Sequence, residues 1–330
     1  MLDCKQIEYN RFAYKLVSVN IGVRKGEQVL IVCDTNTDLR VAYAIAGAVD
    51  AVGGEYTVSI MRSLPSDNAT STTDMIAKAA EAADVIVSLN RYNSCAIFDS
   101  RVTRLIQEKR LRDITLSCRD PQTFLEGGAL ADYEEILQDG LALKKIWEKD
   151  HEFRVKSLLG TDLYGKIGNY PISLGCGIAR EAGEGMAFSD GEISCSPNNG
   201  TVSGTVVIDG PIFNFRQPDT PIRMSIQNSQ VISIDDGDKD IVEGLREMLS
   251  NVPNFNWLAE IAVGLNPCSL KNGSFPEEKK ARGNMHIALG DNVYYGGSNS
   301  CPVHMDLILK NCTMTLDDKV ILDHGKIVEM

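Results

Sequence analysis

The sequence predicts an α/β protein of two domains, the first a doubly wound parallel sheet and the second a strand-rich α+β domain. In the first half, short apolar runs alternate with helical segments, as in a parallel sheet with crossover helices. From about residue 159, Gly becomes more frequent and period-two alternation takes over. A chain of 330 residues is long enough for two hydrophobic cores. We therefore expect an α/β domain with bridging helices over 1–158 and a strand-rich domain over 159–330.

The first domain is predicted to contain four strands separated by helices. Gln28–Asp34 reads as a buried parallel strand, and Thr35–Asp38 supplies N-cap residues for a helix that stops at Gly53-Gly54. The same reasoning gives further strands over 55–61, 84–89 and 113–118, and helices over 39–52, 72–83 and 99–109. Residues 121–158 are expected to be helical and to lead into the second domain.

The second domain is predicted from alternation and turn signals. The segments 201–210 and 231–234 alternate like strands, and each runs into an Asp- and Gly-containing turn. Residues 239–249 favour a helix. The last segment, 314–330, is typical of a hairpin that turns at Asp317-Asp318 and again at 323–325.

Composition excludes several classes of partner. A net charge of -12 argues against nucleic acid and against an anionic membrane surface, because both select Lys and Arg clusters. We expect no signal peptide, because the N-terminus carries Asp3 and Glu8 and no apolar segment, and no membrane span, because no run of 18 apolar residues occurs. None of the nine Cys forms C-x-x-C, which favours reduced thiols in a cytoplasmic protein. No phosphate-binding Gly motif follows the first strand, so nucleotide binding is not supported.

Five residues of the second domain form a candidate set of metal ligands. Two of the four His in the chain fall in the segments 285–290 and 303–306. His304 and Asp306 are two apart, so on a strand both side chains point to one face. Glu260 lies in an apolar segment, where a carboxylate without a partner would be costly to bury. The candidate ligands are Glu192, Glu260, His286, His304 and Asp306.

Each candidate ligand also has an ordinary structural interpretation. Glu192 follows an Asp-Gly turn and fits a surface carboxylate, while His286 fits a hydrogen-bonded core histidine. Taken together, three carboxylates and two imidazoles favour one or two divalent ions, and two ions sharing a carboxylate would make a hydrolytic site. Two His and one Asp alone would instead satisfy the facial triad of a non-haem Fe(II) enzyme.

The motif segments resemble a known family of metallopeptidases. The segments 259–267, 283–290 and 303–306, with 189–192 upstream and 23–31 in the first strand, are similar to the aminopeptidase T/aminopeptidase S family, M29. The resemblance implies a homodimeric two-domain enzyme with two metal ions (Zn, Co or Mn) held by the five candidate ligands, with Glu260 bridging. It also implies a catalytic Tyr after the segment 285–290, for which Tyr294 and Tyr295 compete.

A second resemblance competes with the first. The 2,5-dihydroxypyridine 5,6-dioxygenases are similar to the same family and use one non-haem iron, and the resemblance implies a His where this chain has Glu260. Because Glu192 and Glu260 are both present, we predict a metal-dependent hydrolase, most simply an aminopeptidase acting on a peptide or small molecule, in which Glu260 also acts in catalysis. The alternatives are an Fe(II) dioxygenase that opens a dihydroxypyridine ring and a non-catalytic small-molecule binder.

Overall fold

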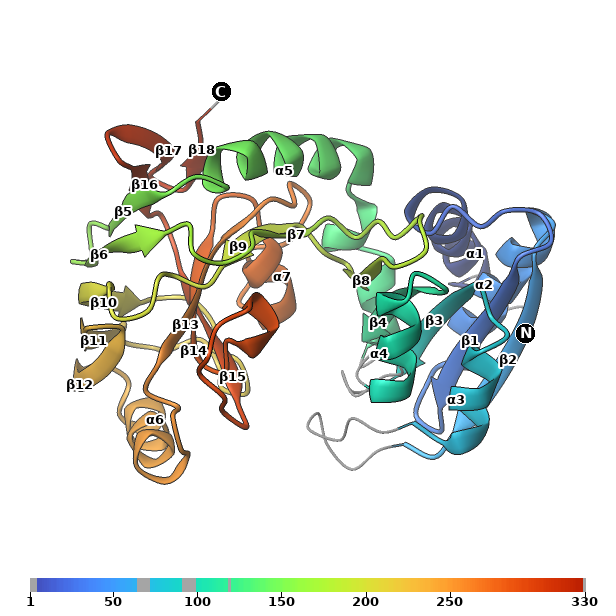
Figure 1. Ribbon diagram of the computed structural model, residues 1–330, viewed down its shortest axis with the longest axis horizontal. Coiled ribbons are helices and arrows are strands. Elements are labelled where there is room, and N and C mark those ends of the chain that lie inside the picture. The colour runs from blue at the N-terminus through green and yellow to red at the C-terminus, as the bar shows by residue number, and fades with distance from the viewer. Residues whose placement is uncertain (1–4, 64–71, 91–98, 118–119, 329–330) are drawn as a thin grey trace. The chain divides into compact units, whose positions relative to one another are not determined.

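The computed structural model in Figure 1 describes residues 5–63, 72–90, 99–117 and 120–328. It contains a parallel sheet and antiparallel strand-rich sheets, so the predicted fold class is confirmed. The chain forms two compact units, which we call the N-terminal unit (Met1–Tyr133 with Gly175–Asp190) and the C-terminal unit (Glu134–Leu174 with Gly191–Met330). The boundary expected after residue 158 falls between two paired strands of the C-terminal unit.

The N-terminal unit is built on a five-stranded parallel sheet with the order β2-β1-β3-β4-β8. The strands are β1 (Gln28–Asp34), β2 (Glu55–Met61), β3 (Val85–Asn90), β4 (Arg112–Ser117) and β8 (Gly185–Phe188). The first four are the predicted strands. The fifth strand comes from a segment that returns to this sheet after the chain has entered the C-terminal unit. No local sequence pattern predicts this return.

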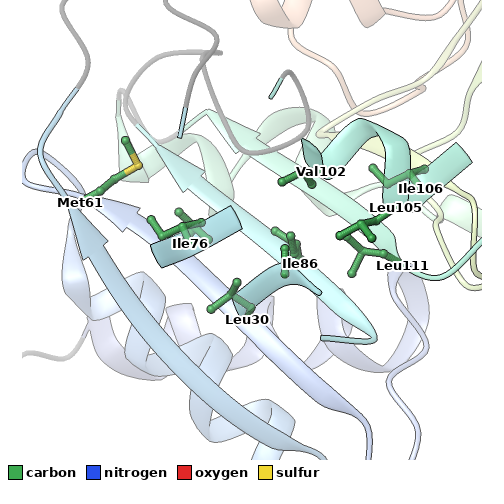
Figure 2. Close-up of a cluster of buried hydrophobic side chains, with 10 residues drawn as sticks. Leu30, Met61, Ile76, Ile86, Val102, Leu105, Ile106 and Leu111 are labelled. Atoms are coloured by element: carbon green, nitrogen blue, oxygen red, sulfur yellow. The ribbon is translucent and has the colours of Figure 1, made fainter. Parts of the chain in front are cut away.

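Helices cover this sheet, and their first residues follow the predicted capping chemistry. The helices are α1 (Lys5–Lys15), continued by a π-helical turn (Leu16–Asn20), α2 (Leu39–Ala51), α3 (Asp74–Ala80) and α4 (Ser100–Gln107). The side chains of Asp38, Thr73 and Asp99 each accept a backbone N–H of the first turn. Figure 2 shows Leu30 and Ile86 of the sheet packed against side chains of α3 and α4, including Ile76 and Val102.

The prediction that residues 121–158 are helical throughout is wrong. The segment contains two 3₁₀ helices (Pro121–Phe124 and Gly127–Leu130), then α5 (Tyr133–Trp147) and strand β5 (His151–Lys156). The Gly127-Gly128 pair interrupts a continuous helix. In β5 the inward Phe153 and Val155 alternate with polar residues, a strand pattern that the many charges conceal.

The larger sheet of the C-terminal unit has eight strands in the order β12-β11-β10-β6-β5-β16-β17-β18, and its pairings are antiparallel. Its remaining strands are β6 (Asp162–Ile167), β10 (Ser203–Ile208), β11 (Ile222–Gln227), β12 (Gln230–Asp236), β16 (Thr313–Leu316), β17 (Lys319–Asp323) and β18 (Lys326–Ile327). Helix α6 (Lys239–Asn251) packs on β12. The predicted strands, helix and C-terminal hairpin of this region are therefore confirmed.

A second, five-stranded sheet of the C-terminal unit has the order β15-β14-β13-β9-β7. Its strands are β7 (Ser173–Gly175), β9 (Glu192–Cys195), β13 (Leu258–Gly264), β14 (Met285–Gly290) and β15 (His304–Leu309). Two short helices accompany it, α7 (Phe275–Lys280) and a 3₁₀ turn (Val293–Tyr295), and Figure 1 shows α7 beside these strands. In the part of the chain that is described, no helix is long and apolar enough to cross a membrane.

Candidate metal centre

All five candidate ligands lie on four neighbouring strands of the five-stranded sheet, β9, β13, β14 and β15. Each ligand lies opposite a Gly or an Ala on one adjacent strand, which leaves space for polar side chains to approach one another above the sheet. The facing pairs are Glu192–Gly264, His286–Ala262, Glu260–Ala288, Asp306–Ala288 and His304–Gly290.

The ligand atoms form two groups that share Glu260. One contains Glu192, Glu260 and His286, the other contains Glu260, His304 and Asp306, and the atoms of each group lie within 4.8 Å of one another. Each oxygen of Glu260 lies near the histidine of one group. Oε1 lies 3.6 Å from Nε2 of His286, and Oε2 lies 2.9 Å from Nε2 of His304. The facial triad considered from the sequence, His286 with His304 and Asp306, is thus divided between the two groups.

Several buried polar atoms in this cluster lack a hydrogen-bond partner among the described residues. They are Oε2 of Glu192, both ring nitrogens of His286 and Oδ1 of Asp306. Buried polar groups left unsatisfied are rare because each one costs free energy. Nε2 of His286 also lies 3.5 Å from Oε2 of Glu192, a separation that suits two ligands of one ion. The donor set therefore fits a divalent metal ion.

Neighbouring groups orient the ligands. Nδ1 of His304 lies 2.7 Å from the backbone oxygen of Asp291, so an Nδ1–H donated there leaves Nε2 facing the cluster. The hydroxyl of Tyr295 donates to Oε1 of Glu260 at 2.7 Å and accepts from Oγ of Ser194 at 3.2 Å. Of the two competing tyrosines, the structure brings Tyr295 into the cluster, whereas the side chain of Tyr294 is 81% exposed.

Two lysines from α7 complete the cluster, and the sequence analysis missed both. Nζ of Lys279 lies 2.9 Å from Oδ2 of Asp306, and Nζ of Lys280 lies 2.8 Å from Oε1 of Glu192. They belong to the run Glu277–Lys280, which as a sequence pattern is typical of a solvated surface. The sequence signal that could have indicated these lysines is the position of the run, a few residues before the segment that carries His286.

Electrostatics keep the carboxylates ionised. Burial alone would raise the pKa of Glu192, but the ammonium groups of Lys279 and Lys280 outweigh it and lower that pKa. Burial also opposes ionisation of Glu260, yet the imidazoles of His286 and His304 hold its pKa well below the usual value. Burial and the charge of Glu260 together raise the pKa of Tyr295 well above its usual value, so its hydroxyl stays a neutral donor.

The centre is closed on one side and open on the other. The side chains of Glu260 and His286 are fully buried, whereas that of His304 is 32% exposed. A small molecule would therefore reach the ligands from the side of His304. Ionised carboxylates, oriented imidazoles and a solvent-accessible edge together describe a candidate metal site with one accessible side.

The fold and this cluster define a two-unit α/β protein with a candidate metal centre of nitrogen and oxygen donors. The family model described as NicX, 2,5-dihydroxypyridine 5,6-dioxygenase, matches residues 12–329, and the chain belongs to this family. A 2,5-dihydroxypyridine 5,6-dioxygenase of Pseudomonas putida is 25% identical over an alignment length of 267, and the match covers 76% of this chain and 73% of that protein.

Solved structures show the same fold. The 2,5-dihydroxypyridine dioxygenase of Pseudomonas putida KT2440 matches with a TM-score of 0.85 and 20% identity, covering 98% of each chain. AmpT from Thermus thermophilus matches with a TM-score of 0.69 and 13% identity, covering 99% of this chain and 100% of that one. The resemblance to the aminopeptidase family is therefore real at the level of fold.

The predicted hydrolase and aminopeptidase activity is wrong, because the family match and the curated relative are both dioxygenases. The error came from weighing Glu192 and Glu260 as evidence for a second metal ion, although carboxylates near a metal centre also serve as partners for cationic side chains. The structure shows such a partner for Glu192 in Lys280, whereas Glu260 is bonded to Tyr295 and His304.

Proposed function

We propose that the protein is a metal-dependent dioxygenase that opens the ring of a hydroxylated pyridine, with 2,5-dihydroxypyridine as the substrate to test first. The observation that carries the proposal is the family match over residues 12–329, a range that includes every candidate ligand. The cluster of unsatisfied nitrogen and oxygen atoms supports it, because such atoms can hold a non-haem metal ion, a cofactor that carries O₂ chemistry.

The proposed metal is Fe(II), held by Glu260, His304 and Asp306, with His286 and Glu192 beside it. When bound, Fe(II) would supply the one-electron chemistry that lets O₂ react with an aromatic ring. This chain has Glu260 where the resemblance implied a His, so the proposed group contains one imidazole and two carboxylates. It is therefore a more anionic variant of the two-His, one-carboxylate triad of non-haem iron enzymes.

The surrounding residues supply orientation and exclude water. His304 presents Nε2 because the backbone of Asp291 engages its other nitrogen. Tyr295 holds Glu260 in one rotamer through a short hydrogen bond. The complete burial of Glu260 and His286 keeps bulk water from that side of the centre.

The test is an aerobic assay of the purified chain after reconstitution with Fe(II). We expect O₂ uptake with 2,5-dihydroxypyridine, one O₂ per substrate, and both atoms of ¹⁸O₂ in the ring-opened product by mass spectrometry. His304→Ala should lose bound iron and O₂ uptake together, whereas Lys271→Met on the surface should keep both. Iron-loaded protein that consumes no O₂ with this compound or with other dihydroxypyridines would refute the proposal.

A further inference from the structure

Helix α7 carries four consecutive charged residues with little access to solvent. Glu277 and Glu278 are buried, and the side chains of Lys279 and Lys280 are only 17% and 12% exposed. Charged residues are almost never buried unless they are paired. The whole run must therefore be held by specific partners, and its two halves have different ones.

The two acids anchor the helix. Glu278 accepts from the backbone N–H of Gly273 at 2.9 Å, from Nδ2 of Asn284 at 3.0 Å and from Nζ of Lys310 at 2.9 Å. Glu277 accepts from the backbone N–H of Leu270 at 2.7 Å. These bonds fix α7 at a defined position, which in turn fixes where the two lysines point.

The C-terminal end of α7 lies directly on the sheet. A Cβ added to Gly264 would come within 2.3 Å of the backbone oxygen of Ala281 and 2.8 Å of the carbonyl carbon of Lys280. Only Gly permits such a close approach of two backbones. Gly264 faces Glu192 on the neighbouring strand, so this approach delivers the lysines to the candidate ligands.

Each lysine binds one oxygen of a candidate ligand's carboxylate. Lys279 contacts Oδ2 of Asp306, and Lys280 contacts Oε1 of Glu192. The other oxygens, Oδ1 of Asp306 and Oε2 of Glu192, have no hydrogen bond among the described residues. Lys279 also lies 3.8 Å from Oε2 of Glu192, between the two ligand groups.

The charge balance of the centre then limits how many ions it holds. The carboxylates of Glu192, Glu260 and Asp306 contribute three negative charges, and the ammonium groups of Lys279 and Lys280, which contact Asp306 and Glu192, compensate two of them. One divalent ion outweighs the remaining charge. A second divalent ion would leave a large positive excess in a buried site, which is strongly unfavourable in a low dielectric.

We propose that Lys279 and Lys280 are positioning residues that restrict the centre to one divalent ion, supplying the positive charge that a second ion would otherwise provide. The inference rests on the proposed function only in requiring that the centre binds a metal. In this arrangement Glu260, His304 and Asp306 hold the ion, Lys280 neutralises Glu192 of the other group, and Lys279 lies between the two groups.

The experiment counts Mn(II) ions bound to the full-length chain after removal of endogenous metal. Stoichiometry is measured by isothermal titration and by elemental analysis after gel filtration, and electron paramagnetic resonance detects two adjacent Mn(II) ions by their magnetic coupling. The wild type should bind one ion. Lys279→Met and Lys280→Met should each gain a second site or bind a second ion at least tenfold more tightly, with a coupled spectrum at saturation.

Two matched variants distinguish charge from structure. Lys279→Arg keeps the positive charge and should remain at one ion, whereas Lys271→Met removes an exposed lysine nearby and should behave like the wild type. Two ions in the wild type, or one ion with unchanged affinity in both methionine variants, would overturn the inference. A wild type that binds neither Mn(II) nor Fe(II) would overturn the proposed function as well, so the two failures are distinguishable.

Discussion

Tyr294 and Tyr295 are adjacent in the chain, yet their environments are opposite. Only the hydroxyl of Tyr295 reaches Glu260, because the short 3₁₀ turn directs one ring inward and leaves the other exposed. Tyr295→Phe removes one donor from a buried carboxylate, and loss of such a ligand-orienting bond costs roughly 10- to 100-fold in metal affinity or activity. We expect a fall of that size in kcat or Fe(II) affinity, measured by O₂ uptake and metal titration.

Tyr294→Phe is the matched control for that prediction. It changes the same type of side chain one position earlier, on the surface, and should alter kcat by less than about twofold. Equal losses in the two variants would mean that the turn as a whole, and not the bond to Glu260, determines activity.

Asp113 is a buried carboxyl group in the N-terminal unit, and it predicts a pH dependence of stability. Burial raises its pKa to about 7, although the hydroxyls of Ser88 and Thr115 donate to it. Since the folded state binds this proton more tightly than the unfolded state does, stability falls as pH rises from about 4 to about 7 and is then constant. The loss amounts to up to about 4 kcal/mol.

Asp113→Asn should remove that dependence and stabilise the N-terminal unit at pH 8 relative to the wild type. The measurement is hydrogen exchange of peptides from β3 and β4 at pH 5 and pH 8, corrected for intrinsic exchange rates. Protection in the wild type that is independent of pH, or equally dependent in the variant, would contradict the prediction.

At the scale of elements, local patterns predicted correctly those helices and strands whose apolar residues follow a single periodicity. Strands β1 to β4 and helices α2 and α6 follow from apolar runs, capping residues and terminal glycines. The prediction for the segment around β5 was wrong because its charges suggest the surface of a helix. Pairing with β6 and β16 makes the segment a central strand instead. Helix α7 was missed for the related reason that a run of charges normally indicates solvent.

The close contact between the C-terminal end of α7 and the sheet can be tested by a substitution at Gly264. Gly264→Ala introduces a Cβ that must displace the backbone near Ala281, and overpacking of this kind costs about 1–3 kcal/mol. We expect a lower unfolding midpoint and weaker metal binding, because Lys279 and Lys280 move with the helix end. Thermal denaturation and metal titration measure the two effects.

Gly47→Ala serves as the comparison, since it lies on the exposed face of α2 with nothing within 4 Å of an added Cβ. Replacing Gly by Ala inside a helix stabilises by up to about 1 kcal/mol, so this variant should be at least as stable as the wild type. If Gly264→Ala were as harmless as Gly47→Ala, the contact between α7 and the sheet would not be what positions the lysines.

At the scale of the whole molecule, the candidate ligands belong entirely to the C-terminal unit. Metal binding should therefore stabilise that unit selectively, by about 2.7 kcal/mol when free metal is one hundred times its dissociation constant. Hydrogen exchange with and without a chelator should show loss of protection in β9 and β13 to β15 and little change in β1 to β4. An equal response in both units would contradict a centre confined to one of them.

The family itself became clear only at this scale. The motif segments resemble two kinds of enzyme, and the number of carboxylates among them favoured the hydrolase. The match over residues 12–329 overturned that choice. The structure supplies a physical reason for the error, since two of the three carboxylates counted as metal ligands also face ammonium groups from α7.

The sequence by itself determined the fold class, the strands β1 to β4 with helices α2 to α4 between them, and the nitrogen and oxygen donors that gather in the cluster. These depend on periodicity, capping and residue chemistry, which act within one element. Only the tertiary structure decided that β8 returns to the first sheet, that Glu260 joins two ligand groups, that Tyr295 and not Tyr294 reaches them, and that two lysines face the carboxylates. Each of these depends on pairing between segments far apart in the chain, which no local pattern encodes.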